Sequence, residues 1–222
     1  MDIQNEKVME TETVEFGKGK FNWKKELREW FVAILIAVVL ALIVRNFIFT
    51  LVKVDGKSME PSLHHADRLY VNRLFYEAEK GDVVIFVPKS DPKRPYVKRV
   101  IATEGDTVYI DPQTGDVYVN KVLLEEPYIM EKSTRIGSYI YRLAESGNYS
   151  MENPIVIQPG YIFAMGDNRN NSKDSRDIGQ VSKEEIIGGA VFRFWPFNKV
   201  GILHQDATVS LIDFEDSIYA LG

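Results

Sequence analysis

The sequence predicts a mainly β protein, in which a single N-terminal transmembrane helix precedes an exported antiparallel domain built as a β-barrel or as folded sheets. Two observations support this prediction. A long apolar stretch lies near the N-terminus, and several short runs rich in Val, Ile, Tyr and Phe follow it. Because no long amphipathic helical pattern interrupts these runs, alternating βαβ units are not expected.

The composition limits the possible partners and chemistry. A chain of 222 residues, of which 45% are hydrophobic, is long enough for an anchor and one folded domain of ordinary size. The formal net charge of −5 provides no basic field for a phosphate backbone, so we expect no nucleic-acid partner. The chain has no cysteine, which excludes disulfides, a thiolate nucleophile and cysteine-ligated zinc.

The N-terminal part divides into a tail and an anchor. Residues 1–29 are polar and heavily charged, which is typical of a flexible tail. Residues 30–52 form the predicted transmembrane anchor with a membrane-proximal lead-in, the apolar residues 47–52. The central run, Trp30 to Val44, has fifteen uncharged residues and rises about 22 Å as a helix, less than a ~30 Å hydrocarbon core. A full span therefore needs flanking residues as well, with Arg45 reaching toward the headgroups.

The charges that flank the anchor predict its orientation. The basic residues on its N-terminal side are Lys18, Lys20, Lys24, Lys25 and Arg28. By the positive-inside tendency they keep the N-terminus in the cytoplasm and place the rest of the chain outside, although Lys53 and Lys57 weaken this prediction. A cleaved signal peptide is the alternative, but no small-residue cleavage site follows the apolar run, which favours an uncleaved anchor.

Residues 53–204 form the predicted β domain. The strand-like runs are residues 68–75, 82–87, 96–102, 106–110, 116–124 and 190–197. Between the fourth and fifth runs, Asp-Pro and Thr-Gly in "IDPQTGDVYV" indicate a hairpin. Residues 131–159 are less regular and are interpreted as an inserted excursion, and residues 205–222 as an acidic tail without a chemical signal.

Ser58 in "VDGKSMEPSL" is a candidate nucleophile. A serine can attack a carbonyl only if a neighbouring base takes its proton and a donor holds the oxyanion. Gly56 lets the backbone approach a substrate, and Pro61 fixes the exit of the turn, so the hydroxyl and N–H of Ser58 could point out together. Taken alone, Gly-x-Ser more often marks an ordinary turn.

Lys98 is the candidate base. In a strand it shares one face with Tyr96 and Val100, so this lysine is desolvated if that face is the inner one. Desolvation lowers the pKa of an amine, and the neighbouring charge of Arg99 would add to this effect if it lay close enough. An ordinary strand with its lysine in water is the alternative. A third polar stretch, residues 166–179 "GDNRNNSKDSRDIG", is either an exposed loop or a loop that positions a catalytic group.

These stretches occur together in a defined order behind the anchor. They are "SMEPSL" at residues 58–63, "GDVVIF" at 81–86, "KRVIATEGD" at 98–106 and "GDNRNNSKDSR" at 166–176. In this combination the chain closely resembles a bacterial type I signal peptidase, over the anchor and nearly everything from Val52 to Phe197.

The resemblance implies roles for individual residues. Ser58 would be the nucleophile and Lys98 the general base of a Ser/Lys dyad, without metal or cofactor, in a membrane-bound serine endopeptidase. Ser172 would orient the lysine, and Asp174 and Arg176 would be structural. The residues implied for the substrate pocket are Val54, Met59, Leu63, Tyr96 and Val97. Ser62 stands where the family usually has Thr, and Gly56 where some members have a serine that donates to the oxyanion.

The resemblance also implies the partners: signal peptides of secreted preproteins, the lipid bilayer and, by proximity, the protein export machinery.

Other catalytic motifs in the sequence are less well supported. Ser90 and Lys93 match a Ser-x-x-Lys motif, but nearby prolines suit a loop rather than a helix. His64 and His65 beside Asp67 could form a triad or a metal site, yet such histidines are more often solvated.

His204 stands alone. A self-cleaving repressor would share the dyad but would need a DNA-binding module, which this sequence does not contain. The alternative from another class is an anchored, non-catalytic β domain that binds envelope partners. In such a domain Ser58 and Lys98 would be dispensable.

Overall fold

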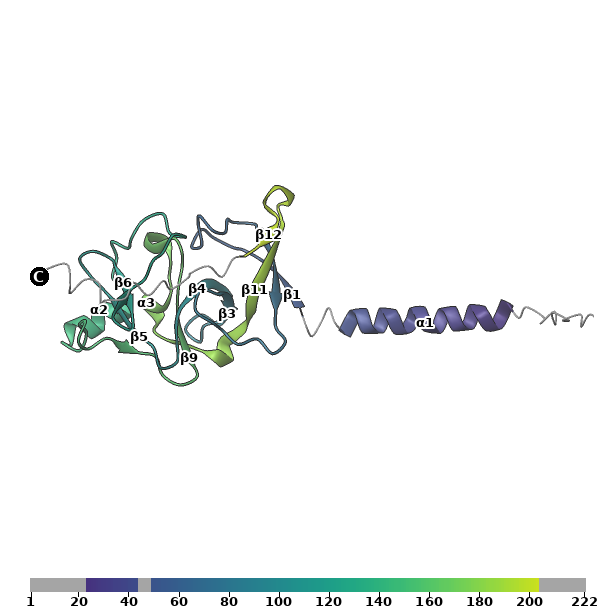
Figure 1. Cartoon of the computed structure of the whole chain (residues 1–222), viewed down its shortest axis with the longest axis horizontal. Helices are drawn as coiled ribbons and strands as arrows, with labels where there is room; N and C mark the ends of the chain where they lie inside the picture. Colours follow the sequence, from purple (N-terminus) through teal and green to yellow (C-terminus); the bar gives the residue numbers. More distant parts are fainter. Residues whose placement is uncertain (1–22, 44–48, 204–222) are drawn as a thin grey trace, which may run out of the picture. The chain divides into compact units, whose positions relative to one another are not determined.

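The computed structural model describes residues 23–43 and 49–203 (Figure 1). The chain divides into two units, one containing the N-terminal helix and the other the β domain, and each is described here by itself. The predicted acidic tail and most of the predicted N-terminal tail lie outside the described residues.

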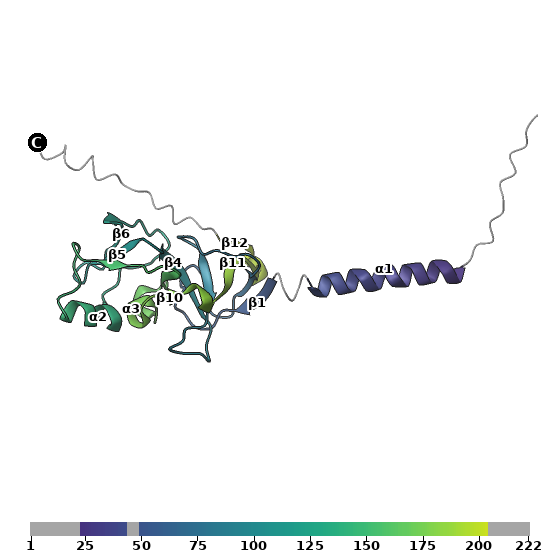
Figure 2. The same cartoon turned by 90° about the horizontal axis from the view of Figure 1, so that it is seen from below.

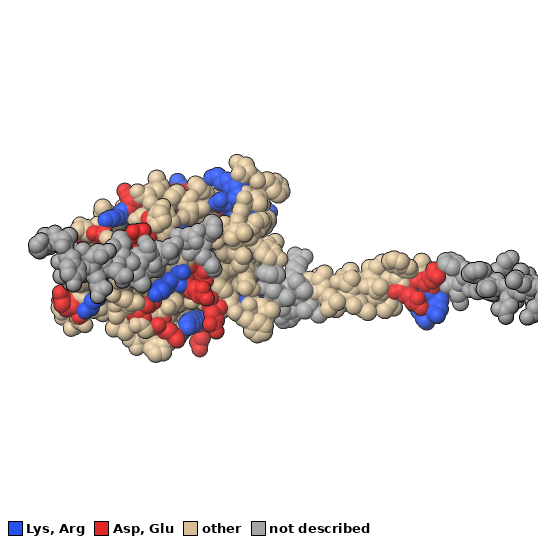
Figure 3. Space-filling model, in the orientation of Figure 1, with Lys and Arg blue, Asp and Glu red and all other residues tan. Residues whose placement is uncertain are grey.

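Helix α1 spans Trp23–Ile43 and therefore begins inside the segment expected to be a tail. Its first turns are rich in strong helix formers, Glu26 favours the helix N-terminus, and Lys25 and Glu29 form an i,i+4 ion pair of 3.9 Å. The charged side chains gather at this end of α1, while its remaining length carries none (Figure 3). Among the described residues, no helix is both long and apolar enough to cross a membrane.

The β domain contains a larger antiparallel sheet with the strand order β1-β2-β11-β3-β4-β9-β10, to which β12 is added beside β11 (Figures 1 and 2). Its strands are β1 (Phe49–Lys53), β2 (Arg68–Asn72), β3 (Val83–Phe86), β4 (Tyr96–Thr103), β9 (Tyr161–Met165), β10 (Val181–Ser182), β11 (Ile186–Trp195) and β12 (Gly201–Ile202). The order has two ends, so the folded-sheet form of the prediction describes the domain better than a closed barrel.

A smaller antiparallel sheet has the order β7-β6-β5-β8. Its strands are β5 (Thr107–Ile110), β6 (Val117–Val119), β7 (Val122–Leu123) and β8 (Ile155–Val156). The helical elements of the β domain are α2 (Ser138–Glu145), α3 (Ser175–Ile178) and the 3-10 turns η2 (Arg169–Asn171), η3 (Lys183–Glu185) and η4 (Phe197–Lys199). The mainly antiparallel β class predicted from the sequence is confirmed.

The predicted strands are found with small shifts of their ends. The hairpin predicted from "IDPQTGDVYV" is the β5–β6 pair, in which Ile110 lies opposite Val117. The run 116–124 is divided into β6 and β7 because Asn120 and Lys121 have φ angles of 53° and 68°. Two successive positive φ angles are what a tight two-residue hairpin requires.

The lead-in to the domain differs from the expectation. Residues 47–52 were expected to extend the anchor, but Phe49–Lys53 forms β1 and pairs along its whole length with β2. Aromatic and β-branched residues favour such pairing. An apolar run of this length does not by itself distinguish a strand from a continuing membrane helix, which explains the difference.

The irregular segment 131–159 contributes to a hydrophobic core. It contains α2 and β8, and Ile140 of α2 is fully buried with Ile155 and Ile157 in the cluster that also holds the inner residues of β5 and β6. A second cluster packs Val54, Met59, Leu63 and Val97 with residues of β2 and β3. This second cluster supports the segment that carries Ser58.

Candidate active site

Ser58 lies in the connection between β1 and β2, which is fixed at both ends. The Val54 N–H donates to the Asp67 carbonyl at 2.8 Å, and the Ala66 N–H donates to the Val54 carbonyl at 2.9 Å. Gly56 has φ +91°, a conformation that favours glycine, and open space surrounds the position of a Cβ there. The chain thus leaves β1, turns at Gly56 and presents Ser58 above the core.

Lys98 is brought to Ser58 by strand β4, although forty residues separate them in the chain. The Lys98 Nζ donates to the Ser58 Oγ at 2.7 Å and to the carbonyl of Val97 at 2.9 Å. Lys98 is only 4% exposed, and its Nζ lies 5.3 Å from the centre of the Tyr96 ring. The amine therefore sits in a largely dry environment with the serine hydroxyl as its nearest side-chain partner.

This environment changes the protonation of the lysine. Burial lowers the pKa of Lys98 from 10.5 to about 8, and the positive charge of Arg176 acts in the same direction. The carboxylates of Asp174 and Asp167 oppose this shift. With a pKa near 8, about a tenth of the amine is neutral at pH 7 and about half at pH 8.

Arg99 does not act on Lys98 as the sequence suggested. Its guanidinium donates from Nε and Nη2 to the two carboxylate oxygens of Asp167 at 2.9 and 2.8 Å, and from Nη1 to the Gly81 carbonyl at 2.9 Å. The guanidinium carbon of Arg99 lies 4.2 Å from the centre of the Tyr128 ring. The positive neighbour that lowers the pKa of Lys98 is Arg176 instead.

The loop after β9 contacts the backbone around Ser58. The Asn168 N–H donates to the Ser58 carbonyl at 3.1 Å, and the Asn168 Nδ2 donates to the Lys57 carbonyl at 3.1 Å. A Cβ added at Gly166 would lie 2.4 Å from the Ser58 carbonyl oxygen and 2.3 Å from the Ser172 Oγ. Only glycine lets these two segments approach so closely. The sequence had indicated a positioning loop but not the particular contribution of Gly166 and Asn168.

Asp174 and Arg176 form a fully buried ion pair beneath this loop. The Arg176 Nε and Nη2 donate to the two carboxylate oxygens at 2.9 and 2.8 Å, and the Gly166 N–H donates to Asp174 at 3.0 Å. Burial alone would raise the pKa of Asp174, but the charge and hydrogen bonds of Arg176 outweigh it and lower that pKa to about 2. The pair thus fixes the loop from below.

Ser172 is buried, and its Oγ has no hydrogen-bond partner of normal geometry among the described residues. It is still close enough to Asp174 to contribute to the low pKa of that carboxylate. Lys98, which Ser172 was expected to orient, donates to Ser58 and to the Val97 carbonyl. Ser172 contacts the active-site loop through its close approach to Gly166.

An open groove of about 610 Å³ contains Ser58 and Lys98. Three of the five residues expected to contact substrate, Val54, Tyr96 and Val97, line it. The other two, Met59 and Leu63, are 1% and 0% exposed and pack in the core cluster under the Ser58 segment. The sequence could not show which of the five residues line the groove and which are buried in the core, because an apolar residue in a turn is compatible with either position.

The residues of the rival motifs have other environments. Ser90 and Lys93 lie in the connection between β3 and β4, outside any helix. The His65 Nδ1 accepts a hydrogen bond from the Gly56 N–H at 3.2 Å, and the His64 N–H donates to Asp67 at 3.0 Å. Within residues 23–43 and 49–203, no three His, Cys, Asp or Glu side chains are grouped as metal ligands. His204 lies outside the described residues.

The arrangement can perform nucleophilic acyl transfer. The Lys98 amine, whose pKa is lowered to about 8, lies within hydrogen-bonding distance of the hydroxyl of the partly exposed Ser58 in an open groove. These are the requirements for a serine nucleophile with a lysine base.

Comparison with known proteins shows which proteins this chain is similar to. Residues 27–195 match the family described as signal peptidase, peptidase S26. Signal peptidase I S of Bacillus subtilis is 38% identical over 183 residues, which cover 80% of this chain and 94% of that relative. Signal peptidase IB of Staphylococcus aureus is 39% identical over 182 residues, which cover 79% and 93%. A crystal structure of a signal peptidase I from Enterococcus faecalis covers 52% of this chain and 97% of its own, at 24% identity and a TM-score of 0.37.

The buried pair predicts a specific loss of stability. We expect Asp174→Asn to lower the free energy of unfolding by about 3–5 kcal/mol, because it leaves the buried Arg176 guanidinium without its counter-charge. The exposed Glu125→Gln is the matched control and should change stability by less than about 0.5 kcal/mol. Urea unfolding of the full chain in detergent measures both, and equal stability of the two variants would contradict this account.

The same pair predicts a pH dependence. The pKa of Asp174 is lowered from 3.8 to about 2, so its stabilisation is present above pH 3.8 and is lost as the pH falls through 2. This group alone should contribute about 2 kcal/mol to that loss. In Asp174→Asn, the decline of stability over this range should be smaller by that amount.

Proposed function

Because this chain belongs to the signal peptidase family, peptidase S26, and is a serine endopeptidase of the signal peptidase I type, we propose that Ser58 and Lys98 are the dyad with which it removes signal peptides from exported preproteins. The observation that carries this assignment is the 2.7 Å hydrogen bond between the buried amine and the hydroxyl. No other serine and lysine of the quoted motifs approach each other in this way in the described structure.

In the first step, the neutral Lys98 takes the proton of the Ser58 hydroxyl as the Oγ attacks the scissile carbonyl carbon. The carbonyl oxygen becomes an oxyanion, which the backbone N–H of Ser58 and neighbouring groups would stabilise, since Gly56 has no side chain to help. The charged Lys98 then gives its proton to the amine of the mature protein as the peptide bond breaks. The signal peptide remains attached to Ser58 as an ester.

In the second step, Lys98 is neutral again and takes a proton from a water molecule that attacks the ester carbonyl. Collapse of this intermediate breaks the bond to the Ser58 Oγ, and the proton returns from Lys98 to that oxygen. The signal peptide leaves with a carboxylate at its C-terminus. No redox change occurs in either step, and the dyad returns to its starting state.

The remaining predicted site residues support the dyad in different ways. Asp174 and Arg176 hold the loop that contacts the Ser58 backbone, and Ser172, buried in the same loop, would orient Lys98. Val54, Tyr96 and Val97 line the groove and would contact small side chains of the signal peptide. Met59 and Leu63 do not line the groove but pack in the hydrophobic cluster that supports the segment with Ser58.

We propose the following places for the parts of the chain: residues 1–29 in the cytoplasm, the anchor between residue 30 and the start of β1, and the catalytic domain from β1 (Phe49–Lys53) onward on the extracytoplasmic side. The uncharged run from Trp30 to Val44 and the basic residues before it support this arrangement. A domain that faces the outer leaflet would meet preproteins as they leave the export machinery.

The dyad is tested by cleavage of a preprotein in liposomes. We expect Ser58→Ala and Lys98→Ala each to lower kcat/KM by at least about 10³-fold, because a nucleophile and its base act as one unit. Ser150→Ala and Lys121→Ala, which lie outside the groove, should retain wild-type activity. Each variant is first compared with the wild type by circular dichroism.

Equal cleavage by all five proteins would contradict the dyad. A folded wild type that cleaves no preprotein would instead favour the anchored, non-catalytic binding domain.

The topology can be tested because the chain has no cysteine. In intact cells, a membrane-impermeant maleimide should label Lys121→Cys, whereas Lys18→Cys should react only after the membrane is opened. The unmodified chain is the control and should remain unlabelled. Labelling of Lys18→Cys from outside would contradict the proposed orientation.

A further inference from the structure

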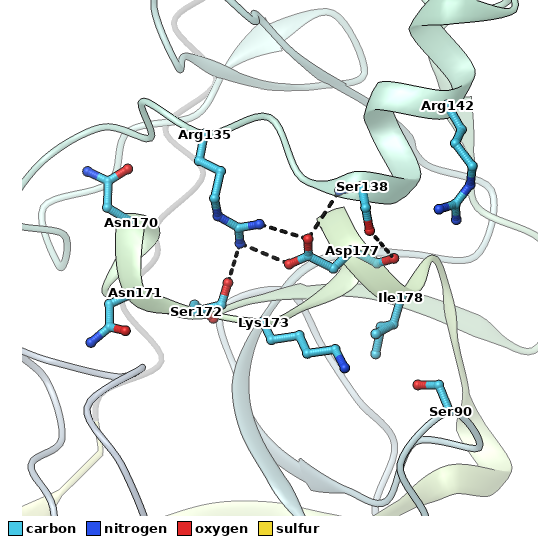
Figure 4. A pocket seen from close by; sticks show the side chains of 10 residues that line it. All are labelled: Ser90, Arg135, Ser138, Arg142, Asn170, Asn171, Ser172, Lys173, Asp177 and Ile178. Carbon is cyan, nitrogen blue, oxygen red and sulfur yellow. Dashed lines mark hydrogen bonds and ion pairs between the residues drawn. The ribbon is translucent and has the colours of Figure 1, made fainter.

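A second hollow adjoins the catalytic groove. Its volume is about 680 Å³, and Lys173 lines both spaces. The residues that line the second hollow are Ser90, Arg135, Ser138, Arg142, Asn170, Asn171, Ser172, Lys173, Asp177 and Ile178 (Figure 4). We call this hollow the basin. Its walls come from three parts of the chain: the loop that fixes Ser58, the helix α2 of the irregular segment 131–159, and the connection between β3 and β4.

The charges in the basin are not balanced. Arg135 is neutralised by Asp177, to which its Nη1 and Nη2 donate at 2.7 and 2.9 Å, and it also donates to the Ser172 carbonyl. Arg142 and Lys173 are exposed and have no ion pair or side-chain hydrogen bond with any part of the chain that the structure describes. The basin therefore carries two unpaired positive charges.

The approach to the basin is also positively charged. Lys53, Lys93 and Arg94 line the groove together with two carboxylates, Asp55 and Asp91. Asp91 accepts a hydrogen bond from the Tyr96 hydroxyl at 3.3 Å, and the Asp55 carboxylate lies 3.4 Å from the His65 Nδ1. This local excess of positive charge contrasts with the formal net charge of −5 of the whole chain. It favours an anionic group of the ligand over a cationic one.

The proposed function, on which this inference rests, limits where such a group can lie in the substrate. A signal peptide has a basic N-terminal region, an apolar centre and small neutral residues before the cleaved bond. None of these regions supplies an anion close to Ser58. The anionic group must then come from the other side of the cleaved bond, which is the beginning of the mature protein.

We propose that the basin is a subsite for an acidic side chain in the first residues of the mature protein, held by Lys173 and Arg142. The apolar part of the groove, with Val54 and Val97, would then hold the signal-peptide side of the cleaved bond. The basin beyond Lys173 would receive the extended chain that leaves Ser58. At about 3.3 Å per extended residue, the first five mature residues span about 16 Å, and these are the positions considered for the subsite.

The interaction should affect selectivity more than total activity. Exposed ion pairs are weak individually and are screened by salt. One contact from Lys173 and one from Arg142 should therefore raise kcat/KM for a substrate with an acidic residue by about three- to tenfold. The basin therefore distinguishes preproteins that already carry the small residues required for cleavage. It does not replace the contacts that the groove makes with those residues.

The experiment compares preproteins that differ only at one of the first five mature positions, where each carries Glu or Gln. For at least one of these positions, we expect the wild type in neutral detergent to cleave the Glu form with a kcat/KM about three- to tenfold higher than that of the Gln form. This Glu-to-Gln ratio of kcat/KM should fall as salt is added. In the double variant Arg142→Glu and Lys173→Glu, the ratio should fall below one. Lys121→Glu makes the same charge change on an exposed turn away from the basin and should keep the wild-type ratio.

The outcomes separate this inference from the proposed function. If the wild type cleaves the Glu and Gln forms equally at all five positions, the subsite is excluded while the peptidase activity stands. If a difference between wild type and the double variant appears only when anionic lipid is added, the basin binds lipid headgroups and the inference is wrong. If the wild type cleaves none of these preproteins, the proposed function itself fails.

Discussion

The site depends on keeping one lysine amine out of water while it remains in contact with a hydroxyl. An exposed lysine is almost fully protonated at neutral pH and cannot accept a proton from serine. Strand β4 holds Lys98 in a buried position, and this desolvation lowers its pKa to about 8. The connection after β1 then brings the Ser58 hydroxyl within hydrogen-bonding distance of the amine.

Two buried carboxylates lie close enough to oppose this effect. Asp167 and Asp174 both act to raise the pKa of Lys98, and unpaired carboxylates in this position would hold the lysine in its charged form. Arg99 neutralises Asp167, and Arg176 neutralises Asp174, each through two hydrogen bonds. The arginines therefore have an electrostatic role besides fixing the loop. Such pairs are costly to desolvate, so their presence here is better explained by the geometry and protonation of the site than by stability.

Much of this arrangement follows from short-range patterns in the sequence. The alternation in β4 placed Lys98 among apolar residues, and the turn signals predicted the β5–β6 hairpin. The distance between Ser58 and Lys98 could not be predicted from these patterns, because it depends on the order in which β1, β2, β11, β3 and β4 pair. The resemblance to signal peptidases supplied the association of the two residues, and the structure supplies a physical reason for it.

Other features depend on contacts between distant parts of the chain, which local patterns do not encode. Arg99 follows Lys98 in strand β4 but forms an ion pair with Asp167, which lies far along the chain. Met59 and Leu63 have the character of pocket residues, but the turn directs them into the core. The close approach of Gly166 to Ser58 depends on how the β9 loop folds back over the β1–β2 connection.

The measurement that tests the central claim most directly is the pH dependence of kcat/KM for cleavage of a signal-peptide substrate by the full chain, since this quantity reports ionisation of the free enzyme. If the neutral form of Lys98 is the base, kcat/KM should rise with pH with a midpoint near 8, the pKa that burial gives this amine. A rate that is independent of pH between about 6 and 9, or a midpoint near that of an exposed lysine at about 10.4, would contradict it.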